Sequence, residues 1–366
     1  MKITLKQLLN PQAKSKIKAG EGKTFGKYKF FASSPIQSKF VDDAIYDKPA
    51  LIFGTGGNAS VHYCDEPFAT STDCLVMYGR NATELQTIYN YLRSNIHIIE
   101  NGFKGAGLKH ISKEYILDIS LEMPDESTQK TLIEKMKMLD STVARLQEQV
   151  AQLDQLVKSR FVEMFGNFVY ERDRWSTCKI GDISDTIDPQ PSHRTPPVSL
   201  DGIPYIGIAE CNYKTLQIDF ANARKVGQDV LQEHLNRYTL DKGDFIIGKI
   251  GTIGKPFFLP VKQTYTLSAN TVLIKPNKLR VEPQFLFAVF QSEYMERIID
   301  AEKKSTSQPA FGIQKVRKID IPMPPLELQQ QFAAFVEQTD KSKLAVKQSL
   351  EKLETLKKSL MQQYFG

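Results

Sequence analysis

The chain has 366 residues, of which 41% are apolar and 25% are charged, an ordinary composition for a globular protein with two or three domains. It contains no run of 18 apolar residues and no apolar signal core near its start, so we expect a cytoplasmic protein that does not enter a membrane. Four widely spaced cysteines without a C-x-x-C pair argue against a zinc or disulfide framework. The net charge of +6 is too small to identify a partner by itself.

The sequence contains a duplication with a period of 200 residues. Residues 119–166 align without a gap on residues 319–366, and 11 of these 48 positions are identical, including the Phe-Gly that ends each copy. Repetition over a domain-sized period indicates a duplicated module. We therefore divide the chain into a first domain (1–118), a first long helix (119–166), a second domain (167–318) and a second long helix (319–366).

The first domain is predicted to be rich in strands. Runs of aromatic and β-branched residues at 27–34, 48–63 and 68–78 are bounded by Gly, Pro and Asn, which is typical of strands and turns. A helix is predicted at 82–94. Basic residues outnumber acidic ones by 15 to 11 over the whole domain.

The first long helix carries apolar residues in steps of four and three, which is the pattern of a heptad seam. One set of seam positions holds Met and Val and the other holds Leu, a combination that favours two-stranded packing. Pro124 precedes the helix, Ser127 and Thr128 are candidate N-caps, and Gly166 is a candidate stop. The predicted seam residues are Leu132, Met136, Leu139, Val143, Leu146, Val150, Leu153 and Val157.

The second domain repeats the order of the first. Strands are predicted within 202–210, 243–259 and 265–276, followed by one helix at 283–300. The domain is longer than the first chiefly because residues 220–244 have no counterpart. It carries 21 basic and 17 acidic residues, so both non-helical segments share the excess positive charge.

The second long helix repeats the seam less regularly, because Thr339, Lys343 and Lys357 are expected to interrupt it. Each helix of about 38 residues would be roughly 57 Å long. Two matching helices in one chain can pair with each other. We predict an α+β fold with pseudo-twofold duplication, in which two mixed, strand-rich domains are separated by an antiparallel intramolecular coiled coil. The seam residues of the second helix are Phe332, Val336, Val346, Leu350, Leu353 and Leu360.

Motifs for catalysis are incomplete. The glycine-rich stretch 51–58 resembles a nucleotide loop, but strand-forming residues follow it and Ala59 replaces the last glycine. The P-loop-like stretch 20–24 lacks the first glycine, because Ile17 stands there. No nucleophile–base set or metal-ligand cluster is recognisable. We therefore expect no catalytic residue, metal site or cofactor on this chain.

Several loops carry residues suited to contact with DNA. Glycine hairpins at 54–63 and 248–256 occupy equivalent places, as do the polar loops 100–110 and 301–312, and a further loop spans 188–197. Lys and Thr suit phosphates, whereas Asn, Arg and Gln can read base edges. The candidate DNA-binding residues are Thr55, Gly56, Asn58, His62, Tyr63, Lys104, Lys109, His193, Arg194, Lys249, Thr252, Lys255, Lys303, Lys304 and Gln308.

These features together resemble the specificity subunit of a type I restriction–modification system. The resemblance is carried by IDIPMPPLELQQQF at 319–332, by LEKLETLKKSLMQQYFG at 350–366 and by their weaker copy LDISLEMPDESTQ at 117–129. The hairpin segments 51–57 and 71–77 add to it. The copy EMPDEST departs from the pattern because it lacks the second proline, and the first domain is short.

The resemblance implies that residues 1–118 and 167–318 are target-recognition domains, each reading one half of a bipartite, asymmetric sequence in double-stranded DNA. It implies that the helices set the gap and dock methylase subunits, two per chain, through which restriction/translocase subunits join. S-adenosylmethionine, ATP and Mg²⁺ would belong to those partners. The alternatives are an S-adenosylmethionine-dependent DNA-modifying enzyme and a structural coiled-coil adaptor.

Overall fold

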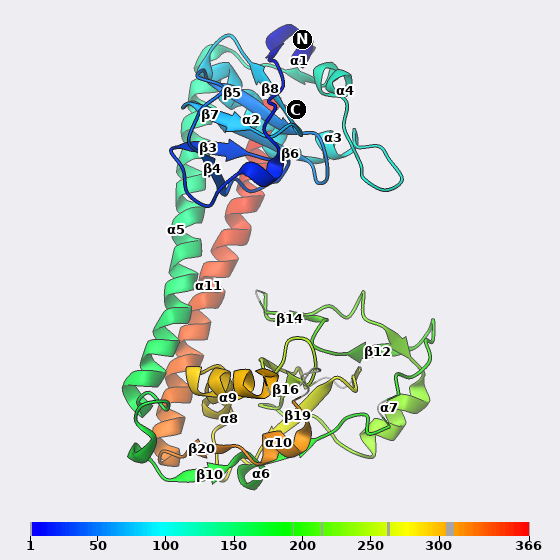
Figure 1. Cartoon of the computed structure of the whole chain (residues 1–366), viewed down its shortest axis with the longest axis vertical. Coiled ribbons are helices and arrows are strands. Elements are labelled where there is room, and N and C mark those ends of the chain that lie inside the picture. Colours follow the sequence, from blue (N-terminus) through cyan, green and yellow to red (C-terminus); the bar gives the residue numbers. More distant parts are fainter. Residues whose placement is uncertain (1, 193, 214, 262–263, 305–310, 366) are drawn as a thin grey trace. The chain divides into compact units, whose positions relative to one another are not determined.

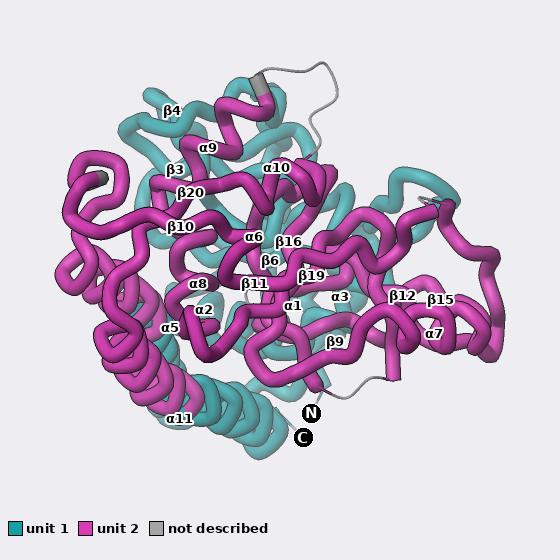
Figure 2. Tube along the Cα trace, turned by 90° about the horizontal axis from the view of Figure 1, so that it is seen from below, with its two compact units in different colours: residues 1–149, 345–366 teal, residues 150–344 magenta. Residues whose placement is uncertain are grey.

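The structure is a computed structural model of the whole chain (Figure 1). The chain forms two compact units, of which unit 1 is built from two separate segments of the sequence and unit 2 from one continuous segment (Figure 2). Unit 1 comprises residues 1–149 and 345–366, and unit 2 comprises residues 150–344. Both long helices therefore contribute to both units. The structure describes residues 2–192, 194–213, 215–261, 264–304 and 311–365.

The part of unit 1 that precedes the first long helix is built from short strands, four α-helices and one 3-10 helix. Its elements are β1 (Lys2–Thr4), α1 (Leu5–Leu8), β2 (Asn10–Pro11), η1 (Ala19–Glu21), β3 (Tyr28–Phe31), β4 (Lys39–Val41), β5 (Ala50–Gly54), β6 (Ser60–Cys64), β7 (Phe68–Thr70), β8 (Cys74–Tyr78), α2 (Ala82–Ser94), α3 (His97–Glu100), α4 (Lys113–Asp118) and β9 (Ser120–Glu122). One sheet has the order β2-β8-β5-β6 and is antiparallel. A second has the order β4-β3-β7, with β3 and β7 parallel, and β1 pairs with β9.

Unit 2 repeats this topology and adds to it. Its elements are η2 (Arg172–Arg174), β10 (Thr177–Lys179), α6 (Ile180–Ile183), β11 (Ser184–Ile187), β12 (Ile203–Ile206), β13 (Cys211–Asn212), β14 (Gln217–Ile218), β15 (Lys225–Val226), α7 (Gln228–Leu235), β16 (Phe245–Gly248), β17 (Pro256–Phe258), β18 (Thr266–Leu267), β19 (Thr271–Pro276), α8 (Pro283–Phe290), α9 (Glu293–Lys304), α10 (Ile313–Arg317) and β20 (Asp320–Pro322). The sheets β11-β19-β16-β17 and β15-β12-β18 and the pair β10-β20 match those of unit 1. Hairpin β13-β14 and helix α7 lie in the longer connection between β12 and β16.

Ten of the twenty strands in the described residues, and α2, overlap the segments where the sequence predicts them, but the prediction of a single helix at 283–300 is wrong. The structure has two helices there, α8 and α9, with a break at Gln291–Ser292. The hydroxyl of Ser292 donates to the carbonyl of Val289 at 2.6 Å. The same carbonyl also accepts the amide of Ser292 (3.1 Å), so the amide and the hydroxyl of Ser292 together close the end of α8 with a tight turn.

The two long helices, α5 (Glu126–Phe165) and α11 (Leu326–Phe365), have 40 residues each. The N-cap of α5 is Asp125, not Ser127 or Thr128 as expected. Its carboxylate accepts hydrogen bonds from the Thr128 amide (2.9 Å) and from both hydroxyls, which lowers the pKa of Asp125 to about 2. Gly166 ends the helix as predicted, with φ of +82°.

Burial along the helices follows the heptad seam. Between residues 141 and 157 of α5, the side chains that are not exposed are Val143, Leu146, Val150, Leu153 and Val157, all of them seam positions. In α11 the line of buried and half-buried positions continues through Thr339, Lys343 and Lys357. The expectation that these three residues interrupt the seam is therefore wrong.

The polar seam residues lie inside because each has a partner. In unit 1, the ammonium of Lys357 lies 2.6 Å from the carboxylate of Asp140, which also pairs with Arg93 at 2.8 Å. In unit 2, the ammonium of Lys343 lies 2.9 Å from both Asp154 and Asp340. Ion pairing therefore offsets the cost of placing the lysines in the seam.

The helices run antiparallel within each unit. In unit 1, Lys135 near the start of α5 donates to the hydroxyl of Tyr364 near the end of α11 (3.0 Å). In unit 2, Phe161 near the end of α5 packs against Phe332 near the start of α11, with ring centroids 5.6 Å apart. The predicted antiparallel intramolecular pairing and the α+β fold class are confirmed.

We predict that Asp140→Ala lowers the free energy of unfolding by about 3 kcal/mol, the low end for breaking a buried ion pair, because Asp140 itself is partly exposed. The cause is the almost buried ammonium of Lys357, which loses its partner. Asp154→Ala is the matched control and should cost less than about 1 kcal/mol, because Lys343 keeps Asp340. Urea unfolding followed by circular dichroism measures both changes.

The double variant Asp140→Ala/Lys357→Met should recover most of the lost stability, because no charge then remains unpaired in the seam. Equal losses for Asp140→Ala and Asp154→Ala, or no recovery in the double variant, would contradict this account of the seam.

Candidate nucleic-acid interface

In unit 1, the turn between β5 and β6 is held against the loop of residues 104–110. The carbonyl of Thr55 accepts a hydrogen bond from the amide of Ile111 (3.2 Å), and the amide of Gly57 donates to the carbonyl of Lys109 (3.3 Å). Gly57 has φ of +76°, a left-handed conformation that favours glycine. Two segments singled out in the sequence thus form one hydrogen-bonded surface.

The turn between β16 and β17 in unit 2 makes the same backbone contacts. The carbonyl of Lys249 accepts from the amide of Phe311 (3.0 Å), as the carbonyl of Thr55 does from its partner in unit 1. The amide of Lys249 donates to the carbonyl of Asn270 (2.8 Å), as the amide of Thr55 donates to that of Asp73 (2.9 Å). Both units therefore present a glycine turn on one common scaffold.

The side chains that this scaffold exposes in unit 1 are polar or basic. Asn58, Lys104 and Lys109 are exposed. Gly56 is fixed below them by the hydroxyl of Ser33, which accepts from the Gly56 amide (3.0 Å) and donates to its carbonyl. The predicted residues Thr55, Gly56, Asn58, Lys104 and Lys109 are thus brought together.

His62 and Tyr63, also predicted to bind, point to opposite faces of β6 and are only partly exposed. The Nε2 atom of His62 lies 2.8 Å from the carbonyl of Ser34, its ring packs near Phe31, and burial lowers its pKa. Tyr63 packs near Tyr89, with ring centroids 6.3 Å apart. Both side chains contribute to packing beside the turn.

In unit 2, the predicted residues Thr252, Lys255 and Lys303 line one cavity of about 610 Å³. The glycine turn, α9 and α5 form its walls. Lys158 on α5 lines it as well. Sequence reasoning missed Lys158, because an exposed position on a predicted long helix carries no signal for a neighbouring domain.

This cavity is mixed in charge with an excess of cations. Two carboxylates, those of Glu296 and Asp300, face its three lysines. Asp300 lies 3.0 Å from the ammonium of Lys303, and the ammonium of Lys255 lies 3.9 Å from the centre of the Tyr213 ring. Such an arrangement suits an anionic ligand that approaches from solvent.

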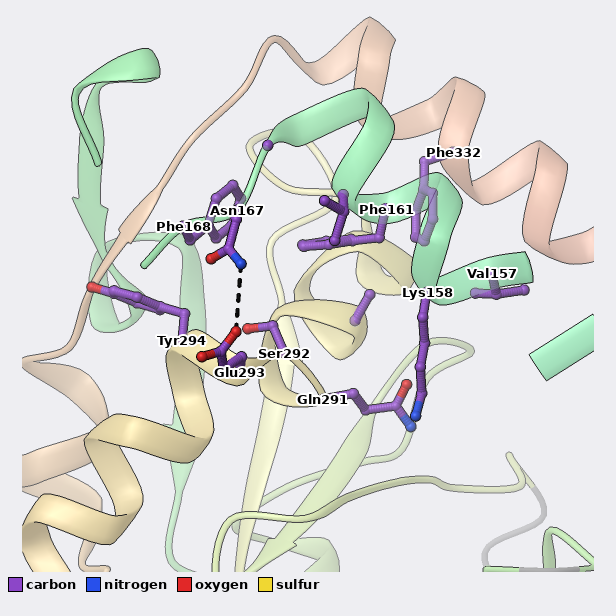
Figure 3. Close-up of a pocket in the computed structure, with 13 residues that line it drawn as sticks. Val157, Lys158, Phe161, Asn167, Phe168, Gln291, Ser292, Glu293, Tyr294 and Phe332 are labelled. Atoms are coloured by element: carbon purple, nitrogen blue, oxygen red, sulfur yellow. Dashed lines mark hydrogen bonds between the residues drawn. The ribbon is translucent and has the colours of Figure 1, made fainter. Parts of the chain in front are cut away.

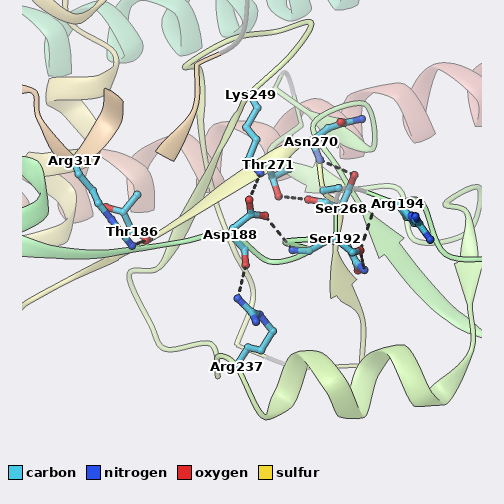
Figure 4. Close-up of polar contacts among 12 residues, drawn as sticks. Thr186, Asp188, Ser192, Arg194, Arg237, Lys249, Ser268, Asn270, Thr271 and Arg317 are labelled. Atoms are coloured by element: carbon cyan, nitrogen blue, oxygen red, sulfur yellow. Dashed lines mark hydrogen bonds and ion pairs between the residues drawn. The ribbon is translucent and has the colours of Figure 1, made fainter. Parts of the chain in front are cut away.

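Lys249 has a different environment from the other predicted lysines (Figure 4). It is 7% exposed, and its ammonium lies 2.8 Å from the carboxylate of Asp188. The guanidinium of Arg237 donates to the backbone carbonyl of the same aspartate (3.5 Å). A phosphate bound by Lys249 would therefore have to compete with Asp188, and its assignment to DNA stays a prediction.

The loop that contains Arg194 is anchored by the buried side chain of His234. One ring nitrogen of His234 lies 2.7 Å from the side-chain oxygen of Gln190, and the other contacts the hydroxyl of Thr266. The side-chain amide of Gln190 in turn donates to Ser192 (2.9 Å). Helix α7, absent from unit 1, therefore positions a loop whose Arg194 is exposed.

Three of the predicted DNA-binding residues cannot be placed in full, because the structure does not describe two of them or the side chain of the third. His193 and Gln308 lie outside the described residues, and Lys304 ends α9 without a described side chain. Lys303 and Arg194, their neighbours, are exposed.

A small apolar pocket lies at the end of α5 in unit 2 (Figure 3). Its lining includes Phe161, Phe168 and Phe332, and the Asn167 side chain donates to Glu293 at its edge (3.4 Å). Its volume of about 160 Å³ is below the range of about 300–1,000 Å³ that ordinary ligand pockets occupy. The pocket is therefore too small for a nucleotide-sized cofactor.

The glycine stretch at 54–59 leads into strand β6, not into a helix, as the sequence indicates. The helix N-terminus that a nucleotide loop requires is therefore missing there.

Within the described residues, no group of three or more His, Cys, Asp or Glu side chains could hold a metal ion. None of the helices in the described part of the chain combines the length and apolar character needed to cross a membrane.

Comparison with known proteins identifies the family. Residues 1–155 and 173–356 match the family described as "Type I restriction modification DNA specificity domain". The chain belongs to this family. It is 22% identical over 354 residues to the "Type I restriction enzyme MjaVIII specificity subunit" of Methanocaldococcus jannaschii. The match covers 89% of this chain and 81% of the relative.

A second relative is the "Type I restriction enzyme EcoBI specificity subunit" of Escherichia coli, 22% identical over 352 residues, covering 86% of this chain and 72% of the relative. The fold is similar to the solved S subunit of a type I system from M. genitalium, with a TM-score of 0.59, 16% identity, and coverage of 100% of this chain and 96% of the other. A second solved structure, described in terms of "complex assembly" of "the type I R-M system", has a TM-score of 0.56 and 14% identity. The match covers 100% of this chain and 97% of the other. The duplicated specificity-subunit fold is thus shared.

We predict that acidification destabilises unit 2 through His234. Burial lowers the pKa of His234, so the unfolded chain binds a proton more readily than the folded chain does. The stability that the neutral ring contributes is fully present above the ordinary histidine pKa of about 6.5 and is lost as the pH falls below it. Urea unfolding at several pH values measures this, and Trp175, the single tryptophan, reports on unit 2.

The control is His234→Gln, which keeps a polar side chain but cannot titrate. Its unfolding free energy should depend less on pH than that of the wild type. An unchanged pH dependence in the variant would contradict the role given to His234.

Proposed function

We propose that this chain is the non-catalytic, sequence-reading subunit of a type I restriction–modification complex. Residues 1–118 and 167–318 act as target-recognition domains, and each reads one half of a bipartite, asymmetric target in double-stranded DNA. The helical segments 119–166 and 319–366 fix the gap between the halves. Methylase subunits dock on the chain and bring the restriction/translocase subunits with them.

The observation that carries this proposal is the repeated junction between a glycine turn and a polar loop. Two of its backbone hydrogen bonds are the same in both units, yet the exposed side chains differ. Unit 1 offers Asn58, Lys104 and Lys109, whereas unit 2 offers Thr252, Lys255 and Lys303. One scaffold with two sets of side chains is what recognition of two different half-sites requires.

A second repeated surface supports the docking of two methylase subunits per chain. Leu156 of α5 and Leu356 of α11 are identical positions of the duplication and are 47% and 50% exposed. The exposed residue Ser159 is likewise repeated at the equivalent position of α11. Because these residues lie outside the seam, pairing of the helices does not explain their identity. Docking of one kind of partner at two equivalent sites does.

The alternative functions have less support. A stand-alone S-adenosylmethionine-dependent enzyme needs a cofactor site, and the glycine stretch lacks the required helix. A structural adaptor needs no basic side chains around paired glycine turns. On the proposed function, S-adenosylmethionine, ATP and Mg²⁺ act on the partner subunits, and the complex works in the cytoplasm.

The test is to map adenine methylation in the DNA of cells that produce this chain together with its methylase subunit. We expect one motif with two specific segments separated by a gap of unspecified bases. A continuous motif, or methylation that does not depend on this chain, would contradict the proposal.

The same assay tests docking. Leu156→Ala/Leu356→Ala should lower methylation at every site without changing the motif, because assembly is weakened while reading is not. Met138→Ala is the matched control, since Met138 is an exposed apolar residue of α5 (71% exposed) whose equivalent in α11 is a glutamine. A changed motif in the double variant would show that the leucines do not act through docking.

A further inference from the structure

The connection between β2 and β3 in unit 1, residues 12–27, is strongly basic. It contains five lysines and a single acidic residue, Glu21. All five lysine side chains are exposed. The excess of four positive charges over the whole first domain hides this local cluster. The five are Lys14, Lys16, Lys18, Lys23 and Lys27.

The first part of this segment is anchored so that its lysines project outward. The side chain of Ser15 is buried, and Ile17 packs against the cluster of Phe30, Val41 and Ala69. The hydroxyl of Tyr46 donates to the carbonyl of Ala13 (2.7 Å). Inward and outward positions alternate, as in an extended strand. The outward positions are Lys14, Lys16 and Lys18.

The second part forms a turn that presents Phe25, which is 84% exposed. On one side of the turn, the backbone groups of Lys23 and Phe40 exchange two hydrogen bonds of 2.9 Å. Lys39 also donates to the carbonyl of Ala19 (2.7 Å). The turn is therefore fixed to the edge of the sheet at β4.

Glycines on both sides of Phe25 allow the turn to lie close to the sheet. A Cβ atom on Gly22 would lie 2.5 Å from the ring of Phe30, and one on Gly26 would lie 2.8 Å from the backbone of Val41. The close approach at both positions brings the backbone beside Phe25 against β3 and β4. A single exposed apolar residue is normal on a protein surface. An exposed phenylalanine among lysines, on a turn that is hydrogen-bonded to the sheet, is a more specific arrangement.

We propose that residues 12–27 form a DNA-contacting arm, in which the lysines bind phosphates of the duplex and Phe25 inserts as a wedge against a base step. This inference rests on the proposed function for its ligand, double-stranded DNA. Apolar wedges of this kind unstack and kink a base step while basic side chains hold the backbone on either side. The arm adds a contact that the glycine turns do not provide.

Charge favours DNA over a protein partner. Among the described residues, Lys14, Lys16 and Lys18 form no ion pair, and Lys23 pairs with the exposed Asp42 (2.6 Å). Lysine is depleted from the cores of protein–protein interfaces, whereas it is the usual ligand of DNA phosphates. A phenylalanine that anchors a protein partner would therefore be expected among uncharged residues and not among lysines.

The first test measures the binding of the full chain to a duplex that carries the target identified by methylation mapping. Phe25→Ala should weaken binding about tenfold, the effect of losing one stacked base contact, without changing the salt dependence. Phe25→Trp should retain binding. A 2-aminopurine placed along the target should brighten at one step with the wild type and stay dark with Phe25→Ala.

The second test uses a duplex of unrelated sequence, so it does not need the target. Lys14→Ala/Lys16→Ala/Lys18→Ala should reduce the slope of log affinity against log salt by about 2 to 3. The matched control is Lys6→Ala/Lys48→Ala/Lys113→Ala, which removes three exposed lysines of the same unit outside the arm and should change the slope less.

The outcomes separate this inference from the proposed function. If the wild type binds its target, and Phe25→Ala binds equally well with the same 2-aminopurine signal as the wild type, the inference about the arm is wrong and the proposed function stands. If Phe25→Ala keeps DNA affinity but loses a methylase subunit, the arm binds protein and the inference is overturned. If the wild type binds no DNA, the proposed function itself fails.

Discussion

Pairing of α5 with α11 is the interaction on which both units depend. Each helix contributes one end to the core of each unit, so neither core is complete without both helices. An apolar seam alone would tolerate a slip by one heptad, whereas Lys343 and Lys357 reach their aspartates in one register only. The side chains that meet in the cores are Leu132, Met136, Met361 and Phe365 in unit 1 and Phe161, Phe165, Phe332 and Val336 in unit 2.

The two copies of the duplicated module share their backbone arrangement and differ in their exposed side chains. The order of the main sheets and two of the backbone bonds that hold each glycine turn are the same in the two units. The side chains on the turns differ, unit 2 adds α7 with its buried His234, and unit 1 carries the lysine arm with Phe25. A shared backbone with different exposed side chains in its two copies is consistent with a subunit that reads two unlike half-sites.

The sequence predicts the two long helices and the central strands of both units, but not repeated short strands such as β1, β4, β10 and β20. The heptad steps give the seam, and strand runs separated by glycines give β5, β6, β16 and β17. It fails where a partner comes from elsewhere in the chain. Lys343 and Lys357 look like breaks in the seam because Asp154 and Asp140 lie on the other helix, and the pairing of Lys249 with Asp188 is equally hidden. The break at Ser292 depends on one hydroxyl, and the lysine arm is hidden in the average charge of its domain.

The most direct test of the account is zero-length carbodiimide cross-linking of the full chain, followed by mass spectrometry of its peptides. This chemistry joins an amine to a carboxylate with which it is already paired. The account predicts intramolecular links between Lys357 and Asp140 and between Lys343 and Asp154, the two pairs that define the antiparallel register. Links from Lys343 to Asp140 and from Lys357 to Asp154, or links found only between two chains, would contradict it.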